Sequence, residues 1–441
     1  MLWLFLACNP GVVEFETDEP AVSVPVVDGE TDTTSLPGVS GNTGEDVDDD
    51  GWRTSLDCDD GDPLVHPGVE ELCDPNDVDE NCDGLADEET PGLVCSVEVT
   101  LSVEARPSVV DLTFLVDTSS SNSAAATAIR GLIPDLLETL AIEGIEPTLG
   151  VAGFEDYALP GLGDVGDLPF RPFHQQTTDS ALIAAALEGD IVHGGGSPLD
   201  AGYEALYQLL SGVGYDQDCN GVLDVTDVSP LVPTEDDAFA GEASGWFTPT
   251  VAGTGSEGGM AFVERSLRIV LVVTNSEWRD PGQGDASPGG CSTDAGAGTV
   301  GAALTDNVRV LGAMVGMDES DPGWAQLSDL ASASNAIRGD GSSAVFAWSA
   351  DADLLAGEIT DVIEASDLGD VTAVVVSDDA FHVDSVAPSS WSNVTFGEDL
   401  SFVLTLDGPV ATGPSEGIDS VVIELQSSGG FALARLVLLV E

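Results

Sequence analysis

Oxygen-bearing side chains recur at a fixed spacing in the stretch "YDQDCNGVLDVTD" (215–227). The spacing matches positions 1, 3, 5, 7, 9 and 12 of a calcium-binding loop, with Gly221 at position 6, where the chain must turn tightly. The predicted ligands are Asp216, Asp218, Asn220, the backbone carbonyl of Val222, Asp224 and Asp227. We therefore predict a bound Ca²⁺ here, with a mainly structural role.

A second stretch, "DVDDDGWRTSLD" (46–57), repeats this scheme and is followed by further acidic sequence. The predicted ligands are Asp46, Asp48, Asp50, the carbonyl of Trp52, and Asp57. A partial loop follows, with Asp79, Asn81, Asp83 and Asp87. Few core residues accompany these acids, so residues 46–95, here called the acidic module, need metal ions or disulfides in order to fold.

A third group lies in "DLTFLVDTSSSNS" (111–123), where Asp117, Ser119 and Ser121 follow an apolar run. Ligands of open α/β sheets bind beyond the carboxyl ends of the strands. Oxygen donors in a tight loop select a hard cation, Mg²⁺ or Ca²⁺. The spacing therefore predicts a cation site at a strand end.

The elements that would position these residues differ along the chain. Residues 108–369 alternate buried strands with helices, which predicts a doubly wound α/β domain, interrupted by an insertion at 211–265. Residues 370–441 alternate with period two between Gly, Pro and Ser, which predicts antiparallel β structure. The strand at 96–107 would complete a β-sandwich with this tail, so the α/β domain would be inserted in the sandwich.

The strand, "DTSSS" and the order of elements over 108–369 resemble a von Willebrand factor type A domain. The resemblance implies a metal site on Asp117, Ser119 and Ser121, with Mg²⁺ or Mn²⁺ as its ion. It implies two further ligands, a Thr for which Ser197 or the acidic Asp200 would stand, and an Asp where this chain has Asn275. "GFEDY" (153–157) is similar to an integrin β strand that carries an auxiliary Ca²⁺ ligand, and this resemblance would make Asp156 a further candidate ligand.

The acidic module resembles a short metal-binding repeat of bacterial secreted and surface proteins, through the order "DCDD", "PG", "EELCD" and "NCDGLADEE". Six cysteines are disulfide candidates: Cys58, Cys73, Cys82, Cys95, Cys219 and Cys291. An even number suits an exported protein with three disulfides, whose pairing the sequence leaves open.

The composition of the chain limits the classes of molecule that it can bind. The 441 residues include 80 acidic and 10 basic residues, all ten of them arginine, for a net charge of −70. Such a charge excludes nucleic acid and anionic lipid as binding partners, because the acidic surface would repel their phosphate groups. "MLWLFLAC" resembles a lipoprotein signal (1–8) with Cys8 as the lipidated residue, and 9–45 reads as a linker. The alternative is a misplaced start of the chain.

We therefore expect an exported lipoprotein of the outer membrane or cell surface, or a secreted protein, which contacts a membrane only through its lipid. Its expected function is divalent-metal-dependent adhesion or recognition of a protein carboxylate or another surface component. The alternative is a structural or metal-sequestering protein with an inert type A site. No catalytic motif is present, so we do not expect an enzyme.

Overall fold

The computed structural model describes most of the chain from residue 96 onward and two parts of the acidic module. The described residues are 3–4, 46–69, 78–84, 96–188, 192, 194, 198–218, 220, 227–228, 257–286, 288, 295–378, 382–407 and 419–440. Within them, no helix combines the length and the apolar character needed to cross a membrane.

A six-stranded sheet forms the centre of the α/β part. Its strands, in spatial order, are β10 (Val345–Ala347), β9 (Val308–Met314), β7 (Leu267–Thr274), β3 (Val110–Asp117), β4 (Thr148–Phe154) and β5 (Arg171–Thr177). All neighbours are parallel except β4 and β5. Every residue of β3, β4, β7 and β9 is buried, as expected of parallel strands covered on both faces.

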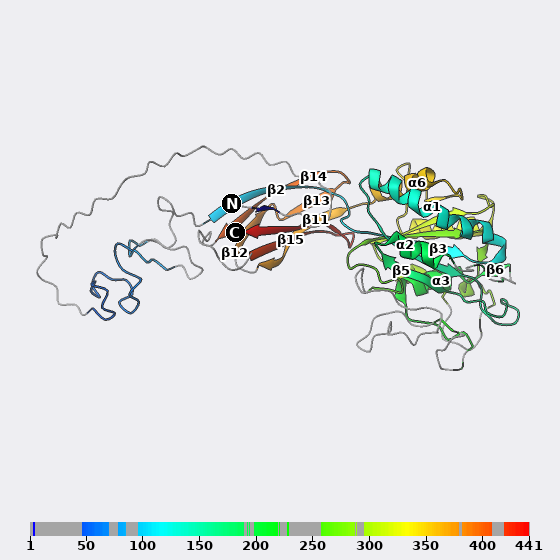
Figure 1. Cartoon of the computed structure of the whole chain (residues 1–441), viewed down its shortest axis with the longest axis horizontal. Coiled ribbons are helices and arrows are strands. Elements are labelled where there is room, and N and C mark those ends of the chain that lie inside the picture. The colour runs from blue at the N-terminus through cyan, green and yellow to red at the C-terminus, as the bar shows by residue number, and fades with distance from the viewer. Residues whose placement is uncertain are drawn as a thin grey trace, which may run out of the picture.

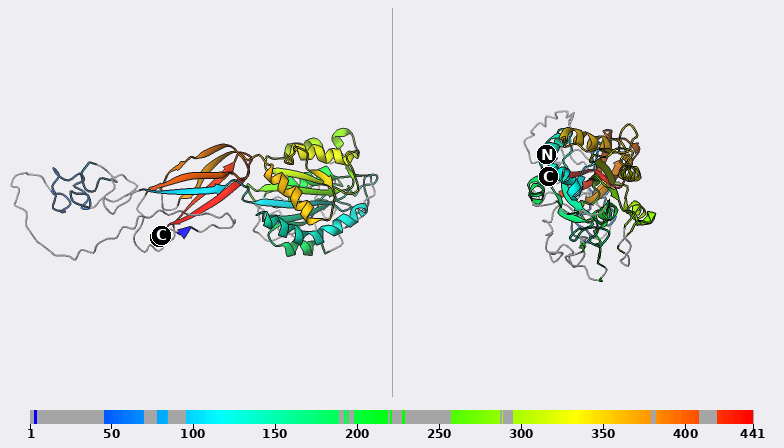
Figure 2. Two further views of the ribbon diagram at one scale, coloured as in Figure 1. Left: turned by 90° about the horizontal axis from the view of Figure 1, so that it is seen from above. Right: turned by 90° about the vertical axis from the view of Figure 1, so that its right-hand side faces the viewer.

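Helices cover both faces of this sheet (Figures 1 and 2). On one face, α1 (Ser123–Ile142) contacts α2 (Ser180–Ala186) and α6 (Ala352–Glu364). On the other, α4 (Ala297–Ala303) contacts α3 (Gly202–Ser211) and α5 (Pro322–Ala333). This arrangement confirms the predicted α/β class with a mostly parallel sheet.

Two antiparallel sheets lie beside the α/β part (Figure 1). One has the order β12 (His382–Ala387), β14 (Asp399–Asp407) and β2 (Ser96–Glu104). The other has the order β1 (Trp3–Leu4), β16 (Ala432–Val440), β15 (Asp419–Ser427), β11 (Gly369–Asp378) and β13 (Ser390–Val394). The ring of Trp391 on β13 meets Phe402 of β14 edge to face, with centroids 5.9 Å apart, so the two sheets pack together.

The chain enters and leaves the α/β part through these antiparallel sheets. β2 precedes β3 in the sequence, yet it pairs with β14 from Ser96 opposite Asp407 to Glu104 opposite Asp399. β11 begins at Gly369, shortly after α6 ends. The α/β part is therefore connected at both of its ends to the antiparallel sheets: β2, which precedes it, belongs to one sheet, and β11, which follows it, belongs to the other. Four short elements complete the fold of the described residues: η1 (Ser120–Asn122), β6 (Leu199–Asp200), β8 (Glu277–Trp278) and η2 (Pro281–Gln283).

Candidate metal centres

The carboxyl ends of β3 and β7 lie side by side and bring the third group of predicted ligands together. Asp117 is fully buried. Its Oδ1 accepts a hydrogen bond from the Ser119 N–H at 2.9 Å, and its Oδ2 accepts one from the Thr274 hydroxyl at 3.0 Å. The Asn122 side chain ties the two strand ends by donating to the Asp117 carbonyl at 2.8 Å and to the Val273 carbonyl of β7 at 3.3 Å. The carboxylate is therefore held in one orientation.

The neighbouring hydroxyls and amide converge on the same point. The Ser119 and Ser121 hydroxyl oxygens are 3.0 Å apart, and the Ser121 hydroxyl donates to the Asn275 Oδ1 at 3.3 Å. Four of the predicted ligands, Asp117, Ser119, Ser121 and Asn275, thus form one cluster of oxygen donors. We call it the Asp117 centre.

Asp200 joins this centre from another segment. Its strand β6 pairs in parallel with β8, and the Ser276 hydroxyl contacts both Asp200 Oδ2 and, at 3.1 Å, Asp117 Oδ2. Burial and the nearby negative charge of Asp117 raise the pKa of Asp200 well above its usual range. Of the two residues predicted for this loop, the structure brings in Asp200. Ser197 lies outside the described residues.

Two residues of the centre were not predicted from the sequence. Thr274 and Ser276 flank Asn275, and both donate to Asp117 Oδ2. Their hydroxyls are also 3.0 Å from each other. The only signal is the polar run "TNSE" directly after an apolar strand, from which the type A pattern selects Asn275 alone.

Asp156 has a partner that the sequence did not suggest. Its carboxylate is fully buried and forms a two-pronged ion pair with Arg279, with Nη2–Oδ2 at 2.5 Å and Nε–Oδ1 at 3.2 Å. The predicted auxiliary Ca²⁺ ligand is therefore already neutralised by a guanidinium group. Arg279 also donates its backbone N–H to the Asp200 carbonyl at 2.8 Å, which places this ion pair beside the Asp117 centre.

The adjacent Glu155 is a buried acid that forms hydrogen bonds to segments beside the Asp117 centre. Its Oε1 accepts from the Thr118 hydroxyl at 2.9 Å and its Oε2 from the Leu168 N–H at 3.1 Å. Burial raises the pKa of Glu155 to about 7, although the charge of Arg171 opposes the rise. Its backbone carbonyl accepts from the Ala201 N–H at 2.8 Å, so Glu155 links β3 to the segment after Asp200.

The predicted calcium loop at 215–227 is closed at its base. Tyr215 and Val228 exchange two backbone hydrogen bonds, of 2.8 and 3.0 Å. Asp216, Asp218 and Asp227 each offer a carboxylate oxygen within 4.8 Å of the others. The Asn220 N–H donates to Asp216 at 3.2 Å and to Asp218 at 3.0 Å, which folds positions 1, 3 and 5 around a common point.

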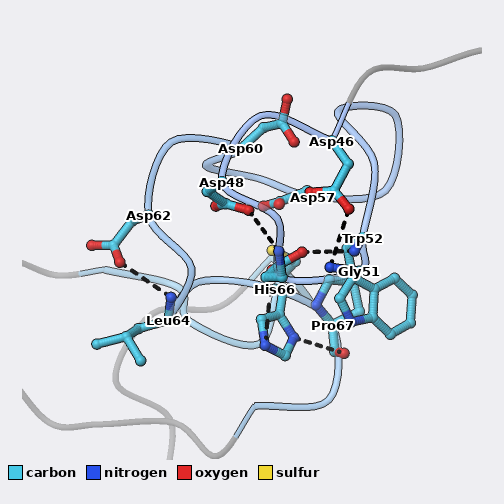
Figure 3. A network of polar contacts seen from close by, with 12 residues as sticks. Asp46, Asp48, Gly51, Trp52, Asp57, Asp60, Asp62, Leu64, His66 and Pro67 are labelled. Atoms are coloured by element: carbon cyan, nitrogen blue, oxygen red, sulfur yellow. Dashed lines mark hydrogen bonds and ion pairs between the residues drawn. The ribbon is translucent and has the colours of Figure 1, made fainter.

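The acidic module gathers carboxylates in the same way (Figure 3). Asp48, Asp50 and Asp57 offer oxygens within 4.8 Å of one another, and so do Asp46, Asp48 and Asp60. Asp60, which was not predicted, also accepts from the Val47 N–H at 3.2 Å. Burial and the neighbouring aspartates raise the pKa of Asp48.

Four of these carboxylate oxygens are buried without a hydrogen-bond partner: Asp46 Oδ1, Asp48 Oδ2, Asp50 Oδ2 and Asp57 Oδ2. Buried anionic oxygens are costly unless they are hydrogen-bonded or coordinate a metal. His66 lies at the edge of the cluster, with its Nε2 3.8 Å from Asp50 Oδ2 and its ring stacked on Trp52. The donors present therefore fit a cation.

The partial loop after it repeats the hydrogen bonding of the 215–227 loop. The Asp83 N–H donates to Asp79 at 3.0 Å and to Asn81 at 2.9 Å. A disulfide between Cys58 and Cys82 joins this loop to the end of the first one. The remaining predicted residues lie outside the described residues: Cys8, Cys73, Asp87, Cys95, Cys219, Val222, Asp224 and Cys291.

Comparison with protein families finds one match. Residues 57–88 and 214–224 match the Cu-binding_MopE family, described as a "Putative metal-binding motif". The match confirms the prediction of a metal-binding motif in the acidic module and in the insertion of the α/β part. The choice of Ca²⁺ stays a prediction.

Solved structures similar to this chain include a von Willebrand factor type A protein from Catenulispora acidiphila, at 12% identity over 78% of this chain and 68% of that one, with a TM-score of 0.31. They also include the pilus adhesin SpaC from Lactobacillus rhamnosus GG, at 13% identity over 84% of this chain and 49% of the adhesin, with a TM-score of 0.31. The chain thus spans about half the length of that adhesin. No curated protein matches the chain.

Proposed function

We propose that this chain is an exported surface protein that recognises a partner through a divalent cation at the Asp117 centre. The observation that supports it best is the convergence of oxygen donors from three separate segments, 117–121, 200 and 275–276, at the carboxyl edge of the sheet. Oxygen donors of this kind suit Mg²⁺ or Mn²⁺. Asp117, Ser119, Ser121, Asp200 and Asn275 would hold the ion.

The choice of Asn275 bears on what the ion would do. An amide oxygen carries no charge, so Asp117 and Asp200 are the acidic donors among the described residues of the centre. An ion neutralised by few carboxylates attracts a further carboxylate from a partner more strongly than one surrounded by acids. A protein ligand with an exposed acidic side chain is therefore the partner we propose.

The acidic module and the 215–227 loop would bind Ca²⁺ in a structural role, and the bound ions would make both segments rigid. Their donors are carboxylates clustered within 4.8 Å, and such clusters repel themselves until a cation binds. The Cys58–Cys82 disulfide supports an oxidising location outside the cytoplasm. Anchoring by lipid at Cys8, and the absence of catalysis, belong to the same proposal.

Mn²⁺ binding to the whole protein tests the Asp117 centre. Asp117→Ala should remove one class of Mn²⁺ sites, because Asp117 is the buried acid around which the other oxygen ligands of the centre are arranged. Asp135→Ala, which changes an exposed acid on α1, is the matched control and should leave Mn²⁺ binding unchanged. Equal Mn²⁺ binding by Asp117→Ala and the unaltered chain would refute the centre.

Recognition needs a separate test. The purified chain should retain surface proteins in Mg²⁺, release them in EDTA, and retain none when Asp117 is replaced by Ala. Retention that survives both EDTA and Asp117→Ala would place recognition elsewhere on the molecule.

A second function, that of a structural calcium-binding protein with an inert type A site, is favoured by one observation. Both oxygens of Asp117 already accept hydrogen bonds from protein groups, including Ser119, Thr274 and Ser276. A self-satisfied carboxylate needs no ion. Loss of Mn²⁺ binding only on mutation of the acidic loops, and never of Asp117, would establish this second function.

A further inference from the structure

The turn at 155–158 contacts both the Asp117 centre and the base of the 215–227 loop. It follows β4; Glu155 and Asp156 contact residues beside the Asp117 centre, and Tyr157 and Ala158 contact the start of the 215–227 loop. Glu155 accepts from the Thr118 hydroxyl, and its carbonyl accepts from the Ala201 N–H. On the other side, the Ala158 N–H donates to Gln217 Oε1 at 3.1 Å. The turn is therefore a physical connection between two candidate cation sites.

The ion pair of Asp156 and Arg279 links the turn to Asp200. The guanidinium of Arg279 is buried against Asp156 and also reaches the Leu199 carbonyl at 3.3 Å, while its own N–H bonds the Asp200 carbonyl. Arg279 thus contacts both residues of β6 and anchors them to the turn. Asp200 owes its place beside Ser276 and Asp117 to this backbone support and to its pairing with β8.

The loop side of the connection is equally well packed. The ring centroids of Tyr157 and Tyr215 are 5.5 Å apart, and both rings are buried. The Gln217 N–H donates to Asp227 Oδ1 at 2.9 Å, so a predicted loop ligand positions the residue that bonds the turn. Asp227 itself has no exposed surface.

A second route runs through α3, which begins two residues after Asp200. Its Gln208 accepts from the Gly214 N–H at 2.8 Å and donates to the Gly214 carbonyl at 3.1 Å. Gly214 directly precedes the base of the loop. Helix α3 therefore connects the segment that carries Asp200, where the helix begins, to the base of the loop, close to where the helix ends.

We propose that the 215–227 loop, when it binds a cation, positions Asp200 through the 155–158 turn and Arg279, so that cation binding at the loop and at the Asp117 centre is coupled. The inference rests on the proposed function of that centre. Without a cation, repulsion among Asp216, Asp218 and Asp227 loosens the base of the loop, and the turn loses the packing that keeps β6 in place. Arg279 is a positioning residue, because it acts through the backbone of Asp200 and not on the ion.

Equilibrium Mn²⁺ binding to the full chain at a fixed Ca²⁺ concentration tests the coupling. The Asp117-dependent affinity of each variant is obtained by comparison with the same variant carrying Asp117→Ala. Asp227→Asn and Arg279→Gln should each lower this affinity about tenfold, within the range usual for coupled sites. Because both changes interrupt one path, the double variant should lose little more than either single variant.

Further variants separate positioning from general damage. Arg279→Lys keeps the charge facing Asp156 and should restore part of the affinity lost in Arg279→Gln. Gln217→Ala removes the contact with the Ala158 N–H while it leaves the loop carboxylates in place, and it should also weaken Mn²⁺ binding at the centre. Asp57→Asn is the matched control, since it alters a similar loop in the acidic module and should change nothing at the centre.

Linkage requires a reciprocal effect, in which Asp117→Ala lowers the Ca²⁺ affinity of the loop by the same factor. Unchanged Asp117-dependent affinity in folded Asp227→Asn and Gln217→Ala would overturn the coupling. An equal loss in Asp57→Asn would overturn it too, because the effect would then be one of overall charge. Absence of any Asp117-dependent Mn²⁺ binding in the unaltered chain would instead refute the proposed function itself.

Discussion

Glu155 should make the α/β part less stable as the pH rises toward neutrality. Its carboxyl is buried, and its pKa in the folded chain is about 7 against an ordinary 4.5. The folded chain therefore binds more protons than the unfolded chain between these two values. Since stability rises with pH only where the unfolded chain binds more protons, the contribution of Glu155 is greatest below pH 4.5 and is lost as the pH passes through 7.

The size of the effect follows from the same two values. The interval between 4.5 and about 7 corresponds to about 3 kcal/mol of unfolding free energy, to order of magnitude. Glu155→Gln resembles the protonated acid and cannot ionise. At pH 5 we expect the variant and the unaltered chain to be similarly stable, whereas at pH 8 the variant should be the more stable of the two by up to about 3 kcal/mol.

Urea unfolding at pH 5, 6, 7 and 8 measures this difference. The many other carboxylates titrate alike in both chains, so their contribution cancels when the two curves are subtracted. Glu138→Gln, which changes an exposed acid on α1, should give a curve parallel to that of the unaltered chain. A parallel curve for Glu155→Gln as well would show that the burial of Glu155 does not control its ionisation.

Three other outcomes are expected. Replacing Cys58 and Cys82 together by Ser should destabilise the acidic module by about 3 kcal/mol, from the entropy of a loop of 24 residues, as measured by its resistance to proteolysis. EDTA should lower the melting temperature of the whole chain and speed proteolysis of the acidic module, and an unchanged melting temperature would contradict the cation-binding prediction. Gly202→Ala would place a Cβ in steric overlap with the Trp278 ring, so it should cost several kcal/mol in thermal unfolding, on the order of 3. Gly357→Ala, on a helix with open space around it, is its control and should stabilise by up to about 1 kcal/mol.

Local spacing by itself determines much of the metal chemistry. In the 215–227 loop, Asp216, Asp218 and Asn220 stand at every second position, and the same hydrogen bonds fold them together as in the 79–84 loop. Such contacts span at most four residues, so the sequence alone specifies them. The buried run ending at Asp117 likewise predicts a central strand, because strands of a parallel sheet covered on both faces bury every residue.

Tertiary structure alone decided how the Asp117 centre is completed. Ser276 meets Asp200 across 76 residues and Asp117 across 159, and Arg279 meets Asp156 across 123. No local pattern records such distances, because they depend on the order of β3, β4 and β7 in the sheet and on the pairing of β6 with β8. The same packing assigned Asp156 to an ion pair instead of an auxiliary cation site. Sequence thus specified the donors that lie close together along the chain, and the fold chose which distant donors they meet.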